Sequence, residues 1–354
     1  MPHREPPGRI RPFFSCRTWS LKMAGNRRSI VITGASAGVG RAITLRLAGP
    51  DTALALLARD ADALEDVARE VRARGGQALV LPCDVASGDA VAAAGRAATE
   101  AHGRIDVWIN VAMAAVFGTV DQITPEEVRR VTEVTYLGFV NGTMAALRDM
   151  RTRERGTIVQ IGSALAYRGI PLQSAYCGAK HAIRGFTASL RCELAAAGSG
   201  IAITELHLPA VNTPQFDWAR THRDSEPRPA GPVYQPEAIA EAVASAIDRP
   251  AREYWLGRQG PLLIMGNQVW PGLLDRLMAK SGIEGQSTEQ PVKRDQPDNL
   301  FTPVPGLHRT RGRFGQEAAA RVPTFDARLV RASAISAALI VAGMLGFALG
   351  AAFI

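Results

Sequence analysis

The sequence of 354 residues predicts an α/β protein built on a doubly wound, seven-stranded parallel sheet with helices on both faces. Three observations predict this class. Short apolar runs alternate with helical patterns between residues 29 and 257, a glycine-rich turn follows the first run, and 47% apolar against 21% charged residues is ordinary for a globular chain. Strands that are apolar on both sides need cover on both faces, as in parallel sheets with helical crossovers.

Seven apolar segments are predicted as strands, and helical segments connect them. The strands are expected at 29–33, 52–58, 77–82, 105–110, 157–161, 201–208 and 253–256. The helices are expected from the glycine turn to Gly49, from Asp60 to the glycine pair at 75–76, and over 88–101, 125–150, 174–197 and 236–248. Thr124 and Glu127 form a capping box with Pro125 in the first turn, which marks the start of the helix over 125–150.

Composition divides the chain into four parts. Residues 1–28 read as a basic extension, either a targeting arm or a stretch upstream of a true start at Met23. Residues 29–284 form the α/β domain. Residues 285–331 are rich in Gln, Pro, Asp, Arg and Gly and are expected to be a flexible linker.

The fourth part, 332–354, is a hydrophobic helix without a charge, directly after Arg328 and Arg331. At about 1.5 Å per residue it is about 34 Å long, enough for a hydrocarbon core of about 30 Å. We therefore expect a membrane-spanning tail with the arginines on the cytoplasmic side. The alternative is a hydrophobic helix that packs on the protein's own surface or on a partner subunit.

Charge and cysteine content exclude other classes. Residues 30–284 carry 26 basic and 27 acidic residues, whereas residues 1–29 carry seven basic and one acidic residue. A folded part without excess positive charge argues against nucleic acid as the main partner. The four cysteines form no C-x-x-C pair and no zinc-like spacing with the six histidines, which favours a reducing, cytoplasmic setting and no metal site.

The glycine-rich turn predicts a dinucleotide site. It reads Thr33-Gly34-Ala35-Ser36-Ala37-Gly38-Val39-Gly40 between the first strand and the first helix. Glycines allow a tight turn and close approach to a pyrophosphate, and the helix that follows directs its amides at the negative charge. The expected contacts come from Gly34, Ser36, Gly38, Val39 and Gly40.

Arg59 predicts the choice of cofactor. It ends the second strand, where an acidic residue would bind the free ribose 2′-hydroxyl of NAD(H), and residue 58 is alanine. An arginine there can pair with a 2′-phosphate, which favours NADP(H) over NAD(H). The alternative is that Arg59 is an ordinary solvated charge beside Asp60, which is expected to cap the next helix.

Three side chains form a candidate catalytic group. Tyr176 and Lys180 are four residues apart on a predicted helix and share one face, and Ser163 ends the fifth strand. A lysine ammonium about 4 Å from the phenol would favour the phenolate by up to about 4 kcal/mol at an effective dielectric constant of about 20. Tyr176 is then a proton donor and acceptor, and Ser163 a hydrogen-bond donor to a developing oxyanion.

On these motifs, residues 29–257 resemble the short, single-domain branch of the short-chain dehydrogenases/reductases, which have a Rossmann-like fold. The resemblance implies hydride transfer between NADP(H) and an alcohol or carbonyl substrate, with Tyr176 as acid/base. It implies that Lys180 lowers the pKa of Tyr176 and holds the nicotinamide ribose, and that Ser163 positions the substrate carbonyl. Further cofactor contacts are implied for Asp84, Val85, Asn110 and Thr213.

Three positions depart from the family pattern. Residues 110–113 read Asn-Val-Ala-Met instead of Asn-Asn-Ala-Gly, Ala210 replaces the glycine of a Pro-Gly pair, and the catalytic asparagine of the long helix appears as Thr135. Asn141 lies about 240° further around the helix and cannot replace it. We assign Thr135 to the proton relay, and the departures keep open a catalytically weak or inactive, NADP-binding, membrane-associated protein as the alternative.

Two further expectations concern substrate and assembly. Residues 210–235 are a candidate lid in which Phe216 and Trp218 either line an apolar substrate site or pack the lid onto the body. The helices over 125–150 and 174–197 are the surfaces through which members of the family usually pair, which predicts a homodimer or homotetramer. Alanines at 175, 179 and 182 allow close approach there, unless they pack against the protein's own sheet.

Overall fold

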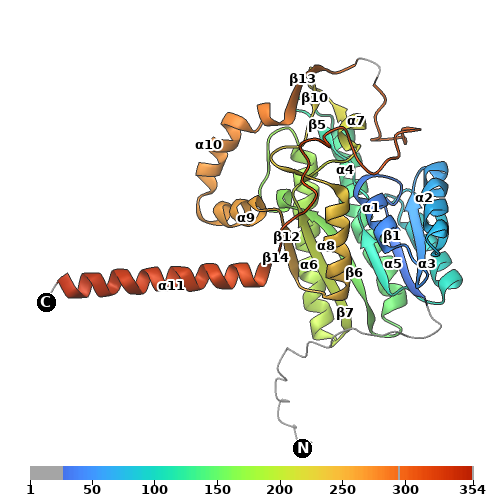
Figure 1. Ribbon diagram of the computed structural model, residues 1–354, viewed down its shortest axis with the longest axis horizontal. Coiled ribbons are helices and arrows are strands. Elements are labelled where there is room, and N and C mark those ends of the chain that lie inside the picture. The colour runs from blue at the N-terminus through green and yellow to red at the C-terminus, as the bar shows by residue number, and fades with distance from the viewer. Residues whose placement is uncertain (1–26, 294–295, 353–354) are drawn as a thin grey trace, which may run out of the picture.

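A computed structural model describes residues 27–293 and 296–352 of the chain. Figure 1 shows a central sheet between two layers of helices, with α11 projecting away from the domain. The strands of this sheet are β1 (Arg28–Thr33), β2 (Thr52–Ala58), β3 (Gln77–Pro82), β4 (Val107–Asn110), β6 (Arg155–Ser163), β7 (Gly200–Leu208), β12 (Glu253–Leu256) and β14 (Thr324–Asp326).

The helices that cover the sheet are α1 (Gly38–Leu47), α2 (Ala61–Ala73), α3 (Gly88–His102), α4 (Pro125–Thr132), α5 (Gly138–Met150), α6 (Ser174–Ala196) and α8 (Pro236–Asp248). Further helices lie beyond the strand ends, namely α7 (Gln215–Trp218), α9 (Gln259–Val269) and α10 (Pro271–Ser281). α11 (Ala327–Ala352) begins directly after the edge strand β14. Short strand pairs join the connecting loops: β5 (Val116–Phe117) with β9 (Arg220–Thr221), β8 (Ala210–Val211) with β11 (Val233–Tyr234), and β10 (Ser225–Pro227) with β13 (Ser287–Pro291).

The sheet has eight strands in the order β14-β12-β7-β6-β4-β1-β2-β3. The seven predicted segments are its parallel strands, and β14 adds an antiparallel edge beside β12. The predicted number of seven is therefore wrong by one. The added strand has only three residues, Thr-Phe-Asp, and lies in a segment without an apolar run, so it carries no recognisable strand pattern.

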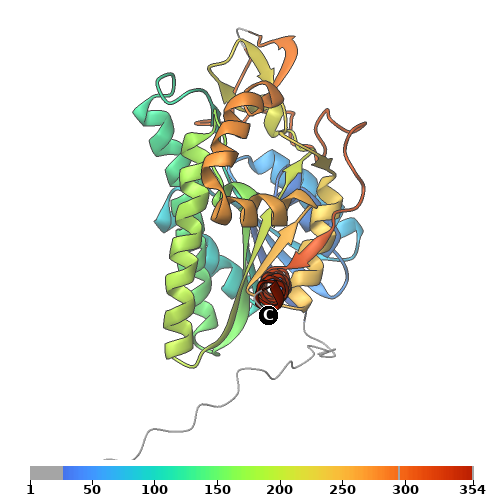
Figure 2. The same ribbon diagram turned by 90° about the vertical axis from the view of Figure 1, so that its left-hand side faces the viewer.

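Alternate side chains of the buried strands form two cores, one on each face of the sheet. Ile30 and Ile32 of β1 pack with α1, α2 and α8, whereas Val31 packs with α3, α5 and α6. Figure 2 places α6 and α8 on opposite sides of the sheet. Both faces are covered, as the apolar strand pattern predicts.

The predicted helix over 125–150 is broken in the structure. α4 begins at the predicted capping box, in which the Thr124 hydroxyl accepts a hydrogen bond from the Glu127 amide. A π-helical turn at Glu133–Leu137 then separates α4 from α5. Thr135 lies within this turn. A π turn inserts an extra residue and redirects the side chains that follow.

The segment expected to be a flexible linker packs against the domain. Residues 296–316 form backbone and side-chain hydrogen bonds to α1, to α7 and to the loop after β2, and residues 287–291 and 324–326 pair as strands. The expectation for 285–331 is wrong because its prolines and polar side chains find partners on the folded surface. Linker-like composition carries no information about those partners.

Two expectations about the ends of the chain have different outcomes. Apart from Arg27 and Arg28, the basic extension 1–28 lies outside the described residues. The C-terminal hydrophobic helix forms as α11, but within residues 27–293 and 296–352 no helix combines the length and apolarity that crossing a membrane requires. The expected membrane-spanning tail is not supported.

Two of the three alanines proposed to mediate subunit pairing are buried within the chain. Ala175 and Ala179 on α6 are 8% and 4% exposed. Their burial corresponds to the alternative reading, packing against the protein's own core, so these two alanines do not provide the close-approach surface.

A buried polar cluster joins β4, β6 and α5. The indole nitrogen of Trp108 donates to Asn110 Oδ1 at 2.8 Å, and Asn110 Nδ2 donates to Gln160 Oε1 at 2.9 Å. Gln160 Nε2 donates to the hydroxyl of Thr143, also at 2.9 Å. Each group has a partner, which offsets the cost of burying these side chains.

This cluster predicts the effect of adding a methyl group beside it. A Cβ at Gly142 of α5 would lie 2.2 Å from Asn110 Oδ1 and 2.6 Å from Trp108 Nε1. We expect Gly142→Ala to lower the free energy of unfolding by about 1–3 kcal/mol, measured by denaturant titration. The matched control is Gly185→Ala on the exposed side of α6, where no atom lies within 4 Å and alanine should stabilise by about 0.5–1 kcal/mol. Equal effects at the two positions would contradict the tight packing around Asn110.

Candidate active site

A cavity of about 570 Å³ opens at the carboxyl ends of β1, β2, β4, β6 and β7. Ligands of doubly wound sheets bind at this edge. Its lining includes most of the residues proposed from the sequence, namely Gly34, Ser36, Gly38, Val39, Gly40, Arg59, Asp84, Val85, Ser163, Tyr176, Lys180 and Thr213. Asn110 and Thr135 do not line it.

The glycine turn has the backbone geometry of a phosphate-binding loop. Gly34 and Gly38 have φ of +67° and +54°, in the left-handed region that favours glycine. A Cβ at Gly40 would lie 1.9 Å from the carbonyl oxygen of Gly34, so only glycine allows the turn to close. α1 begins at Gly38 without a side-chain cap from Ala37, and this leaves the positive end of the helix at the cavity.

Ser163, Tyr176 and Lys180 come together at the inner end of the cavity. The side chains of Ser163 and Tyr176 both line this part of the cavity, close enough for the Ser163 hydroxyl to act on the pKa of Tyr176. The Leu165 amide donates to Ser163 Oγ at 3.1 Å. Lys180 Nζ lies 5.6 Å from the centroid of the Tyr176 ring and donates to the carbonyl of Ile161 at 2.7 Å. The end of β6 and one face of α6 thus hold three functional groups around one point.

Burial sets the protonation of this group. It raises the pKa of the Tyr176 phenol well above its ordinary value, although the nearby Ser163 hydroxyl acts to lower it. Burial also lowers the pKa of Lys180 to about 7. The expectation that Lys180 lowers the pKa of Tyr176 is wrong for this structure, because the amine is directed at Ile161 and desolvation disfavours the charged forms of both side chains.

Thr135 acts on the cavity through the backbone of its wall. Its hydroxyl donates to the carbonyl of Ala114 and accepts from the amide of Ala114, both at 3.0 Å. Ala114 lines the cavity, so Thr135 positions the loop after β4. Asn141 donates instead to the carbonyl of Val85 at 2.9 Å. The side chain of Asn110 points into the buried cluster with Trp108, so its expected cofactor contact is not made by the side chain.

Arg59 is engaged by the C-terminal segment. Its guanidinium donates to the backbone carbonyls of Asn299 at 2.5 Å and Phe301 at 2.9 Å. Burial lowers its pKa, and the nearby Arg130 lowers it further. Arg59 therefore lies in the cavity wall. It is not a freely solvated charge, which was the alternative interpretation of this residue.

Asp84 and Thr213 occupy opposite ends of the cofactor side. Arg130 donates to the Asp84 carboxylate at 2.6 Å, and the Ala86 amide donates to it at 3.0 Å. Burial acts to raise the pKa of Asp84, but these two donors together hold it below its ordinary value. Thr213, which is 9% exposed, lies close to Gly38, since a Cβ on that glycine would be 3.2 Å from the threonine side chain.

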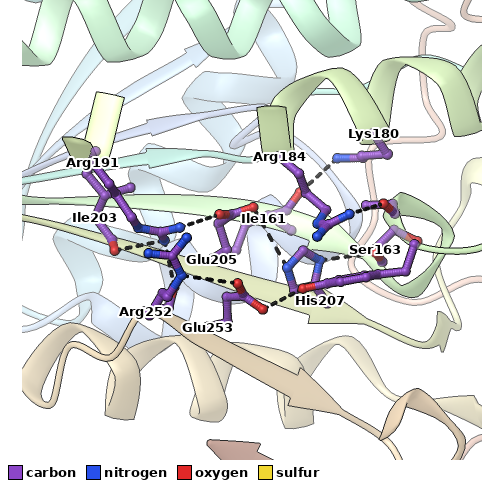
Figure 3. A network of polar contacts seen from close by, with 12 residues as sticks. Ile161, Ser163, Lys180, Arg184, Arg191, Ile203, Glu205, His207, Arg252 and Glu253 are labelled. Atoms are coloured by element: carbon purple, nitrogen blue, oxygen red, sulfur yellow. Dashed lines mark hydrogen bonds and ion pairs between the residues drawn. The ribbon is translucent and has the colours of Figure 1, made fainter. Parts of the chain in front are cut away.

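A second polar network lies directly behind the catalytic group (Figure 3). His207 Nδ1 contacts the carbonyl of Ser163 at 3.2 Å, and because a carbonyl only accepts, this nitrogen carries the proton. Burial lowers the pKa of His207 to about 4, so its ring is neutral. His207 therefore holds the end of β6 on the same face of the sheet as α6, which carries Lys180.

The network continues along the neighbouring strands to the base of α11. Arg191 donates to Glu205 at 2.8 Å, and Tyr167 and Arg331 donate to Glu253 at 2.5 and 2.8 Å. The motifs proposed from the sequence did not include these residues. The one available signal was the presence of Glu205 and His207 inside an otherwise apolar strand, where a charged side chain needs a partner.

The substrate side of the cavity is largely apolar. Phe216 and Trp218 of the candidate lid line it, and Phe216 also packs on Phe117 with ring centroids 6.2 Å apart, so both readings of the lid hold for this side chain. Leu263 of α9 and Met278 of α10 complete the wall. Sequence reasoning missed these two because they follow the sheet by a long interval and carry no motif.

Comparisons with known proteins agree with this geometry. A family model described as short chain dehydrogenase matches residues 28–224. The chain is 33% identical over 282 residues to an uncharacterized oxidoreductase, YxnA of Bacillus subtilis. The aligned region covers 79% of each of the two chains. It is 37% identical over 183 residues to the putative oxidoreductase SadH of Mycobacterium tuberculosis, covering 52% of this chain and 66% of that one.

Solved structures with the same fold include an alcohol dehydrogenase from the archaeon Thermococcus sibiricus complexed with 5-hydroxy-NADP. That structure has a TM-score of 0.57 and 28% identity, and the match covers 65% of this chain and 96% of that one. An NAD+-bound xylitol dehydrogenase has a TM-score of 0.50 and 30% identity, with 52% and 71% coverage. With its glycine turn, its candidate catalytic group and a family match over more than half its length, the chain belongs to the short-chain dehydrogenase/reductase family of oxidoreductases.

Proposed function

We propose that this protein is an NADP(H)-dependent oxidoreductase that interconverts an alcohol and a carbonyl compound of low polarity. The observation that carries the proposal is the grouping of Ser163, Tyr176 and Lys180 at the inner end of a cavity that also contains the glycine turn. The non-catalytic alternative is not favoured, because all three groups of the chemistry share one cavity.

The residues present fit a nicotinamide dinucleotide. The left-handed glycines and the start of α1, which has no side-chain cap, suit a pyrophosphate. Asp84 and Arg59 lie where the adenosine would bind, and Thr213 lies beside Gly38. Such a cofactor, when bound, supplies or accepts the hydride. The protein's own residues must then orient the substrate and move one proton.

Tyr176 is the proposed proton donor in the direction of carbonyl reduction. Its raised pKa keeps the phenol protonated through neutral pH, and Ser163, which lines the same cavity, donates to the developing oxyanion. Because the pKa of Lys180 is about 7, the amine is present in both its protonated and its neutral form near neutral pH. It can therefore pass a proton toward Tyr176. Thr135 is a positioning residue, because it contacts the wall at Ala114.

The preference for NADP(H) rests on the side chains at the end of β2. At the start of α2, the Asp60 carboxylate accepts a hydrogen bond from the Ala63 amide at 3.0 Å, as expected of a helix cap. Residue 58 is alanine. Residue 58 therefore offers no carboxylate to a ribose 2′-hydroxyl, the Asp60 carboxylate is engaged as the helix cap, and Arg59 brings a cation to the cavity. We also propose assembly as a homodimer or homotetramer through exposed parts of α4, α5 and α6.

Removal of the phenol hydroxyl tests the catalytic assignment. We expect Tyr176→Phe to lower kcat for reduction of a panel of ketones and aldehydes by at least about 100-fold, because the proton donor is lost. NADPH binding, followed by fluorescence, should change by less than about twofold, since the dinucleotide contacts remain. The matched control is Tyr254→Phe, whose hydroxyl donates to the Arg249 carbonyl at 2.6 Å away from the cavity. A wild-type protein that binds NADPH and reduces none of the panel would favour the non-catalytic alternative.

Substitution of Arg59 tests the choice of cofactor. We expect Arg59→Ala to raise the Kd of NADPH about 10- to 100-fold more than that of NADH, because a charge-assisted contact contributes about 1.5–3 kcal/mol. Both affinities are measured by fluorescence titration. Arg46→Ala serves as control, since Arg46 pairs with Glu241 on the outer surface. Equal losses of affinity for NADPH and NADH would show that Arg59 supports the site without binding the 2′-phosphate.

The lowered pKa of Lys180 has a consequence for stability. Its folded pKa of about 7 lies below its ordinary value, so between about pH 7 and pH 10 the unfolded state binds more protons. The free energy of unfolding therefore gains up to about 1.4 kcal/mol per pH unit as pH rises through this window. Lys180→Met should remove this slope, measured by denaturant titration from pH 6 to pH 10.

The control for this measurement is Lys280→Met, because Lys280 is exposed on α10. Its pH profile should follow that of the wild type, since all other titrating groups are shared. Parallel profiles for the wild type and Lys180→Met would contradict the burial argument for Lys180.

A further inference from the structure

Residues 298–309, which we call the strap, cross the cofactor side of the cavity. The segment beyond β13 runs back over the top of the domain and close to α1 (Figure 1). The strap contributes Asn299, Leu300, Pro303, Val304 and His308 to the cavity lining. It lies outside the part of the chain that the family model matches, so the family's pattern does not account for it.

One end of the strap is fixed beside the adenosine side of the cavity. The Leu300 side chain is wholly buried in the core formed with α3, α5 and α6, and its carbonyl accepts from Arg130 Nε at 3.0 Å. Arg59 donates to the carbonyl of Asn299, and Asp298 forms an ion pair with Arg220 at 2.9 Å.

The other end is fixed at the phosphate-binding turn. The amide of Gly38 donates to the carbonyl of Arg309 at 3.0 Å, and Arg41 donates to the carbonyl of His308 at 3.2 Å. The side chain of Arg309 pairs with Asp217 of α7 at 2.5 Å. The strap thus reaches from the end of β2 to the start of α1.

The middle of the strap has a constrained backbone. Pro303 and Pro305 fix φ at two positions, which reduces the freedom of the chain between the two anchored ends. Gly306 follows with φ of +77°, a left-handed conformation that glycine adopts at no steric cost. A stiff stretch next to a glycine is suited to move as a unit about that residue.

We infer that the strap encloses the adenosine half of the dinucleotide and has to open for the dinucleotide to leave. This inference rests on the proposed function, because it takes the cavity to be a dinucleotide site. The two anchors lie at Arg59 and Gly38, so a molecule that extends from the adenosine side to the glycine turn passes behind the strap. The Arg309 end of the strap lies at the glycine turn, which makes that end the one that opens.

The proposal is tested by the rate at which NADPH leaves the full-length protein. NADPH-loaded protein is mixed with excess NADP+ in a stopped-flow instrument, and the loss of nicotinamide fluorescence gives the dissociation rate constant. Asp298→Ala and Arg309→Ala each remove one side-chain anchor and leave the lining of the cavity intact. We expect each to speed dissociation about three- to fivefold, and the double variant about tenfold or more, which matches the size of a partly exposed ion pair.

The matched control is Arg311→Ala, because Arg311 pairs with Glu237 on the surface just beyond the strap. Its dissociation rate should equal that of the wild type. Hydrogen exchange supplies a second measurement, in which saturating NADPH should slow exchange of the peptide over 298–309 and leave the peptide over 284–291 unchanged.

The outcomes separate this inference from the proposed function. The wild type could bind NADPH saturably while all variants show equal dissociation rates, or while hydrogen exchange over 298–309 is unchanged. Either result would contradict the role proposed for the strap and leave the oxidoreductase proposal intact. Absence of NADPH binding to the wild type would overturn both. Faster dissociation confined to the anchor variants, together with slower exchange over the strap, would support the enclosure.

Discussion

The contact between the Lys180 amine and the Ile161 carbonyl holds the catalytic group together. It joins α6 to the end of β6 at 2.7 Å, in a place where Lys180 is 2% exposed. Tyr176 lies one helical turn before Lys180, and Ser163 follows Ile161 by two residues, so this contact also sets the distance between the two hydroxyls. A carbonyl accepts from an amine in either charge state, and so the contact persists as the lysine loses its proton near pH 7.

The same strand end is also held by a neutral histidine of the neighbouring strand β7. His207 donates to the carbonyl of Ser163, and the ion pairs of Glu205 and Glu253 surround it. Isolated charges at such depth would be costly, but each carboxylate has an arginine partner. Through Arg331 this network extends to the base of α11, which gives the C-terminal helix a structural connection to the strands that carry the active site.

The C-terminal segment changes the cofactor side of a familiar architecture. The glycine turn and the strand ends are those expected of the family, but Arg59 and Gly38 both contact backbone carbonyls of residues 299–309. The end of the second strand and the glycine turn are therefore both in contact with residues about 240 positions downstream of that strand. Composition alone gave the opposite expectation for this segment, because a segment rich in proline and polar residues reads as a linker whether or not a surface is available to bind it.

Local signals in the sequence determined the parallel strands, the glycine turn, the capping box and the Tyr176–Lys180 pair, since each depends on residues close together along the chain. Only the tertiary structure decided the quantities that depend on distant partners. Among these are the raised pKa of Tyr176, the inward direction of Asn110, the eighth strand, and the engagement of Arg59 by the C-terminal segment. Burial and hydrogen-bond partners arise when remote segments pack together, and neither periodicity nor spacing records which segments will meet.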